Sequence, residues 1–84
     1  MHIDFKKIKE SIEPSLSKLD IEVTDITFRN EGKYNFLTIE LDKLNGIDLD
    51  TIVEATDIIN PIIDKLDMID DTYILDVVSK ERGN

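Results

Sequence analysis

The sequence predicts a two-layer α+β domain of order α-β-β-α-β, with two helices packed on one face of a three-stranded sheet. The chain has 84 residues, which suits a single domain. Two segments repeat apolar residues at helical spacing, and three others are rich in β-branched and aromatic residues. Placing both helices over one sheet face buries the apolar side of every element. We expect the domain to span residues 1–79 and residues 80–84 to form a flexible polar tail.

The first predicted helix runs from about residue 3 to a point between Lys18 and Asp20. Pro14 lacks the backbone N–H that a helix interior uses, so we expect a kink there or two abutting helices. No glycine caps the predicted end. The apolar stripe, spaced mostly by three and four, comprises Ile3, Phe5, Ile8, Ile12, Leu16 and Leu19.

Residues 21–28 and 36–42 are predicted to pair as an antiparallel hairpin. The apolar residues of the first strand change phase midway, so a regular strand cannot place all of them on one face. A β-bulge near Thr24 or Asp25 would restore the phase, and Gly32 can supply the positive φ of the turn. The apolar residues are Ile21 and Val23, then Ile26 and Phe28, and in the second strand Leu37, Ile39 and Leu41.

The second predicted helix begins after Gly46, with Asp48 as its N-cap. Pro61 lies inside its pattern and is expected to end the helix early or to kink it. A loop at residues 67–71 leads to a third strand at 72–78. The expected apolar residues are Leu49, Ile52, Val53, Thr56, Ile59, Ile63 and Leu66 in the helix, and Tyr73, Leu75 and Val77 in the strand.

The charge is strongly negative and uneven. The net charge is −9, and residues 48–76 carry nine carboxylates against one base, Lys65. A nucleic-acid binder needs Lys and Arg to displace counterions from phosphate, so we expect little direct nucleic-acid binding. A basic protein partner fits this surface, although acids that only keep a small domain soluble are the alternative. The candidate partner-binding residues are Asp57, Asp64, Asp67, Asp70 and Asp71.

Residues that could carry catalysis are scarce, so we expect no enzyme. The only histidine is His2, and no second histidine is present to activate a serine. The absence of cysteine excludes thiolate chemistry and disulfides, and it suits the reducing cytoplasm. An acyl carrier protein would need a serine where the second helix opens, and Asp48-Leu49-Asp50 has none.

Cofactor, metal and membrane sites are not expected either. There is no glycine-rich phosphate loop and no GXXG clamp for RNA. The segment 42–46 departs from a calcium loop, because Leu44 occupies a ligand position. The longest purely apolar runs are two residues, too short to span a membrane.

Short segments along most of the chain occur in a characteristic order and spacing. In chain order they are Ile12-Glu13-Pro14, Ile21 to Phe28, Glu31-Gly32, Leu37 to Lys43, Gly46 to Asp50, Asp67-Met68-Ile69, and Tyr73 to Val77. This series resembles the N-terminal domain of the ribosome maturation factor RimP family, from about residue 3 to residue 79. The resemblance implies the α-β-β-α-β fold, no enzymatic activity and a cytoplasmic role in assembly of the small ribosomal subunit.

The resemblance also implies a partner, the basic twelfth protein of the small subunit. The alternative function is a generic acidic protein-interaction domain without a ribosomal role; in either case a monomer is favoured. Members of the family continue into a Ser-Ser-Pro-Gly segment and a second, β-barrel domain. Here Ser79 matches the second serine, Glu81 stands where the family has glycine, and no β-barrel follows within the 84 residues. The chain is expected to be either a piece of a longer protein or a stand-alone relative of the family.

Overall fold

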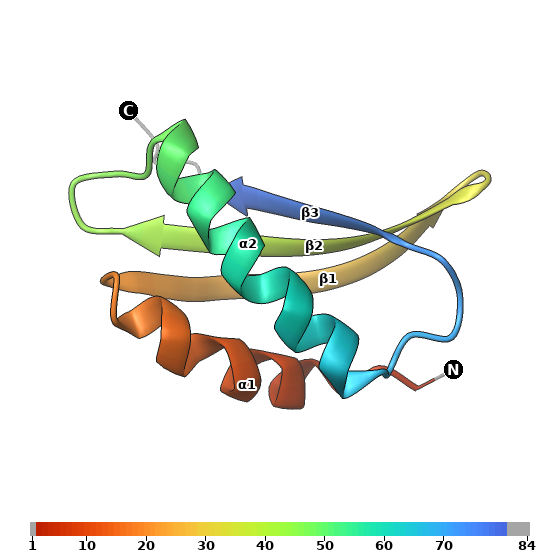
Figure 1. Cartoon of the computed structure of the whole chain (residues 1–84). Coiled ribbons are helices and arrows are strands. Elements are labelled where there is room, and N and C mark those ends of the chain that lie inside the picture. Colours follow the sequence, from red (N-terminus) through yellow and green to blue (C-terminus); the bar gives the residue numbers. More distant parts are fainter. Residues whose placement is uncertain (1, 81–84) are drawn as a thin grey trace.

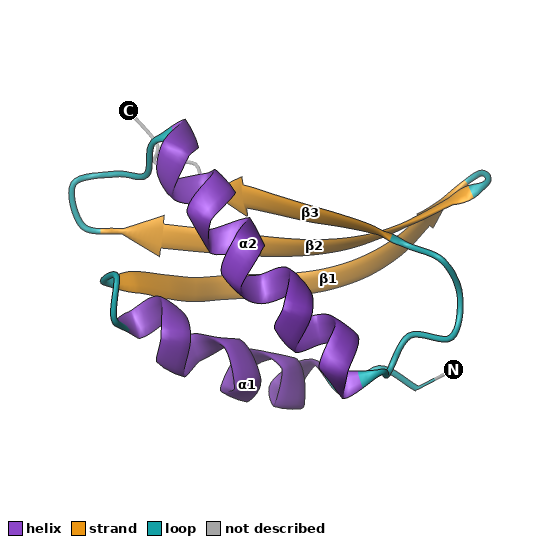
Figure 2. Cartoon of the chain, viewed as in Figure 1, coloured by secondary structure: helices purple, strands orange, loops and turns teal. Residues whose placement is uncertain are grey.

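The computed structural model describes residues 2–80 and has the predicted element order, α-β-β-α-β (Figure 1). The sheet has the strand order β1-β2-β3, and both helices lie on the same face of it (Figure 2). The predicted tail at 80–84 falls outside the described residues except for Lys80, whose backbone N–H donates to the carbonyl of Leu41. The elements are α1 (Phe5–Ser17), β1 (Ile21–Glu31), β2 (Tyr34–Lys43), α2 (Leu49–Leu66) and β3 (Ile74–Ser79).

Strands β1 and β2 form the predicted antiparallel hairpin. Their register shifts between Val23 and Asp25, which confirms the bulge. The shift puts Val23 in the core and still lets Ile26, in the other phase, pack against it. The residue inside the bulge, Thr24, turns its hydroxyl to β2 and donates to the carbonyl and to Oε1 of Glu40, at 3.1 and 2.7 Å. The bulge therefore corrects the phase and also links the two strands through a side chain.

Strand β3 pairs with β2 in parallel, so the chain must cross over between them, and α2 makes that crossing. This leaves β2 in the centre of the sheet. Leu37, Ile39 and Leu41 of β2 are fully buried, as their alternation predicts. Leu75 and Val77 pack against the same core from β3.

Aspartates lie before and after helix α1, whose C-cap is Lys18. Asp4 is its N-cap, and Oδ1 of Asp4 accepts from the backbone N–H of Lys7 at 3.1 Å. After the helix, Asp20 adopts a φ of 59°, which turns the chain into β1 without a glycine. The helix passes through Pro14 as one element, so the expectation of two abutting helices is wrong. Pro14 is exposed.

Helix α2 also continues through its proline. It runs to Leu66, so the expectation that Pro61 ends it early is wrong, and again the proline is exposed. Asp48 is the N-cap as predicted, accepting from the N–H of Thr51 at 2.8 Å. Asp67 closes the helix in the left-handed conformation, with its N–H donating to the carbonyl of Ile63.

The buried row of α2 differs in part from the predicted stripe. Ala55, Ile59 and Ile63 are the buried residues. Leu49 and Val53, expected in the core, are 76% and 54% exposed. At about 100° per residue, Leu49 lies about 80° and Val53 about 120° around the helix from Ile59, the middle of the buried row. The helix crosses the sheet diagonally (Figure 1), so its first turns contribute little to the core.

Candidate functional site

The five aspartates predicted to bind a partner lie on α2 and in the loop that follows it. Asp57 and Asp64 share one face of the helix, because seven residues are close to two full turns and the helix is unbroken between them. Asp67 is the C-cap, and Asp70 and Asp71 lie in the loop before β3. All five side chains are exposed.

Three of these aspartates meet around Tyr73. A hollow of about 390 Å³ is lined by Asp64, Asp71 and Tyr73, together with Asn60, Thr72 and Leu75. A smaller one of about 60 Å³, also lined by Tyr73, brings in Asp67. We call Asp64, Asp67, Asp71 and Tyr73 the acidic hollow. Asp70 lines neither space. Asp57 lies about 10 Å from Asp64 along the helix axis, towards the N-terminus of α2.

Tyr73 is sensitive to this surrounding charge. Partial burial raises the pKa of the Tyr73 phenol above its ordinary value, and the negative charge and hydrogen bond of Asp64 raise it further. The sequence pattern indicated Tyr73 only as a strand residue, and its place beside α2 was missed. The available signal was its position two residues after the last loop aspartate, with a polar group on an aromatic ring.

Replacing Asp64 with asparagine is expected to lower the pKa of Tyr73 towards its ordinary value, because the carboxylate charge is lost while the burial remains. Because the folded pKa is raised, Tyr73 contributes stability below about pH 10 that is lost as the pH rises through the folded pKa. Ultraviolet titration of tyrosinate in a Tyr34→Phe background isolates Tyr73. A Tyr73 pKa that is the same with and without Asp64 would show that the two groups do not interact.

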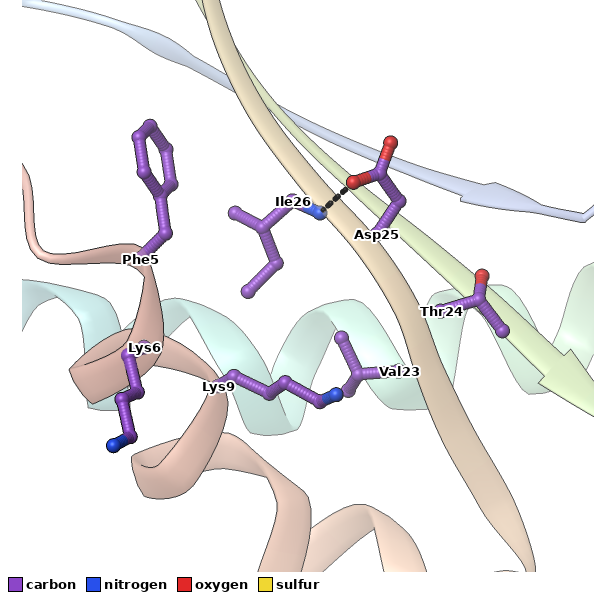
Figure 3. Close-up of a pocket in the computed structure, with 7 residues that line it drawn as sticks. All are labelled: Phe5, Lys6, Lys9, Val23, Thr24, Asp25 and Ile26. Carbon is purple, nitrogen blue, oxygen red and sulfur yellow. Dashed lines mark hydrogen bonds between the residues drawn. The ribbon is translucent and has the colours of Figure 1, made fainter.

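A second groove, of about 300 Å³, lies between α1 and β1 (Figure 3). Phe5, Val23 and Ile26 provide its apolar part, and Lys6 and Lys9 extend from the helix. The carboxylate of Asp25 accepts from the backbone N–H of Ile26 at 3.0 Å. Histidine, cysteine and serine are absent from its lining, and the hydroxyl of Thr24 is engaged with Glu40. The groove therefore offers no activated nucleophile.

Within residues 2–80, no three histidine, cysteine, aspartate or glutamate side chains converge as metal ligands would. Over the same residues, neither helix is long and apolar enough to cross a membrane. The acidic hollow contains carboxylates and one phenol, and these groups can accept hydrogen bonds from lysine or arginine side chains.

The family model of the RimP N-terminal domain matches residues 11–80. The chain belongs to this family. The match contains the whole sheet, all of α2 and most of α1, so the resemblance expected from the sequence is confirmed. RimP proteins are non-enzymatic ribosome maturation factors, and membership of the family suggests a role in ribosome maturation. All five candidate aspartates and Tyr73 lie inside the matched RimP segment.

Proposed function

We propose that this RimP N-terminal domain acts in the cytoplasm, in maturation of the small ribosomal subunit, by binding a basic ribosomal protein, the twelfth protein of that subunit. The acidic hollow, together with Asp57 and Asp70, forms the contact surface. The observation that carries the proposal is the convergence of Asp64, Asp67 and Asp71 around Tyr73 in a chain of this family.

The chemistry of the hollow suits a lysine or arginine side chain. Its volume of about 390 Å³ leaves room for one such side chain and for water. Carboxylates form short, charge-assisted hydrogen bonds with ammonium and guanidinium groups, and the ring of Tyr73 can lie against the cation. Lys65 is the only base between residues 48 and 76, so the neighbouring aspartates repel one another in the free domain. A basic partner relieves that repulsion.

Replacing Asp64, Asp67, Asp70 and Asp71 with asparagine is expected to slow association with the purified twelfth protein by about tenfold at low salt. The dependence of the rate on salt should also become flatter, since exposed charges act mainly on the encounter rate. The fold should survive, because asparagine also tolerates the left-handed conformation that Asp67 adopts. Stopped-flow association rates over a salt series and a circular dichroism spectrum test both expectations.

A matched variant separates local contact from overall charge. This control variant also loses four negative charges, but at exposed or half-exposed positions outside the acidic hollow. Its substitutions are Glu10→Gln, Glu13→Gln, Asp20→Asn and Asp50→Asn. This control should keep most of the association rate. Equal losses in both variants would mean that only the net charge matters. Rates unchanged across salt in the first variant would mean that the acidic surface only keeps the domain soluble.

Co-sedimentation with immature small subunits tests the ribosomal role itself. We expect association at low salt. Absence of the domain from these particles would favour the alternative, a generic acidic interaction domain.

A further inference from the structure

The face of the sheet opposite the helices is uncovered in the described part of the chain (Figure 2). Its side chains alternate along β2 with the buried Leu37, Ile39 and Leu41. Because the acidic hollow is built partly from α2, it belongs to the helix side of the domain, and the two surfaces are separate. An uncovered sheet face that carries apolar side chains is a common place for a partner to dock.

The uncovered face combines apolar and acidic side chains in adjacent rows. The strand register places Phe36 beside Ile74, which is 44% exposed. One row further on, Thr38 lies beside Asp76. In the row after that, Glu40 of β2 lies between Asp25 of β1 and Val78 of β3. We call Asp25, Glu40 and Asp76, with Phe36, Ile74 and Val78, the open sheet face.

Two of its carboxylates are held in place by hydroxyl groups from neighbouring strands. Thr24 donates to Oε1 of Glu40 at 2.7 Å, and Thr38 donates to Oδ2 of Asp76 at 3.2 Å. Within residues 2–80, no lysine or arginine forms an ion pair with Asp25, Glu40 or Asp76. Carboxylates positioned on rigid strands lose little conformational freedom when a cation binds to them.

Arg29, which the strand register places beside Phe36 on this face, is already engaged. Nε of Arg29 donates to Oε1 of Glu31 at 2.9 Å, and its guanidinium carbon lies 5.3 Å from the centroid of the Phe36 ring. Nη1 of Arg29 also donates to the hydroxyl of Thr38 at 3.4 Å, so the guanidinium lies between Glu31 at the hairpin end and the row of Thr38. Within the described residues, the three carboxylates of the open sheet face form no direct ion pair with a base, which favours a positively charged occupant.

The size of the face indicates a segment of chain as the occupant. The part of the face that all three strands share is six residues long, at about 3.3 Å per residue, and three strands wide, at about 4.8 Å spacing, which gives a surface of roughly 20 by 14 Å. The corresponding area, roughly 280 Å², is well below the ~800 Å² that each partner buries in a standard protein interface. One extended segment can cover it.

We infer that the open sheet face docks an extended segment of a protein partner in which pairs of lysine or arginine alternate with pairs of aliphatic residues, so that the side of the segment facing the sheet carries both kinds. The basic side chains meet Asp25, Glu40 and Asp76, and the aliphatic ones cover Ile74, Val78 and the ring of Phe36. This inference is independent of the acidic hollow.

A synthetic peptide that repeats Lys-Lys-Val-Val is the probe, because either side of it in extended form carries both residue types. It is titrated into the isotope-labelled domain and followed by NMR. We expect shifts of the amide signals of β2 and β3, centred on Thr38, Glu40 and Val78. A peptide that repeats Lys-Lys-Ser-Ser keeps the charge and should bind at least about threefold more weakly. Shifts confined to residues 64–73, or no shifts at millimolar peptide, would overturn the inference.

Paired variants give the second measurement. Glu40→Gln with Asp76→Asn keeps the acceptors for both threonine hydroxyls, so the fold is retained, and should weaken binding about fivefold. Asp64→Asn with Asp71→Asn removes the same charge from the acidic hollow and should leave peptide affinity within about twofold. Equal weakening by the two pairs would mean non-specific attraction and overturn the inference. Binding of the twelfth ribosomal protein can fail in its own test without affecting this result.

Discussion

Replacing Ile39 with alanine is expected to lower the free energy of unfolding by about 2–5 kcal/mol. Ile39 is fully buried at the middle of the central strand, where it lies between Ile26 of β1 and Val77 of β3. The substitution removes the transfer free energy of the side chain and leaves a cavity that the surrounding strands cannot close. A domain of this size has a total stability of about 4–13 kcal/mol. Urea unfolding followed by circular dichroism measures the loss.

Ile74→Ala is the matched control, since it removes the same atoms from a strand position that is 44% exposed. We expect a loss below about 1 kcal/mol there, from reduced strand propensity and partial burial. If both substitutions cost the same, the core would not be centred on β2. The Ile74→Ala variant can also be titrated with the peptide. If it binds as tightly as the unchanged domain, Ile74 contributes little to binding at the open sheet face.

The sheet is the part of the fold that could be predicted best from the sequence. The change of phase between Val23 and Ile26 required a bulge, and the register shift occurs there. The alternation of Leu37, Ile39 and Leu41 predicted one buried face, and all three are fully buried. These predictions succeed because side-chain direction in a strand depends on the chain's own alternation.

The helices show what local patterns could not settle. A proline inside a helical pattern can end the helix, or the helix can continue through it. Which of these happens depends on whether the proline is exposed in the folded domain, and exposure is a tertiary property. Both Pro14 and Pro61 are exposed, and both helices continue. The parallel direction of β3 was likewise undetermined, because it depends on how α2 crosses the sheet.

The candidate site was predicted as a set of charges without its geometry. Asp64, Asp67 and Asp71 were identified from composition, whereas Tyr73 joins them only because the loop folds back towards α2. The open sheet face was not recognised at all. Its six residues come from three strands, and their neighbours depend on the bulge and on the parallel pairing. Local sequence patterns do not specify which residues of distant strands pair with one another, and the open sheet face depends on that pairing.

Ala55→Leu is expected to lower the free energy of unfolding by about 1–3 kcal/mol, because it adds three carbon atoms to a fully buried site. Ala55 was absent from the stripe predicted for α2, yet with Ile59 and Ile63 it makes up the buried row. Its small side chain lets the backbone of α2 approach the rest of the core closely. Thermal and urea unfolding measure the loss, and the NMR spectrum should show displaced signals for α2.

Val53→Leu serves as the control for Ala55→Leu, because it adds an aliphatic carbon on the same helix at a side chain that is 54% exposed. A change within about 0.5 kcal/mol is expected there, as for most surface substitutions. Destabilisation by Val53→Leu together with tolerance of Ala55→Leu would reverse the assignment of faces and support the stripe read from the sequence. The observed orientation requires the opposite pattern: Val53 and Ala55 lie about 160° apart around α2, with Val53 exposed and Ala55 fully buried in a close-packed core.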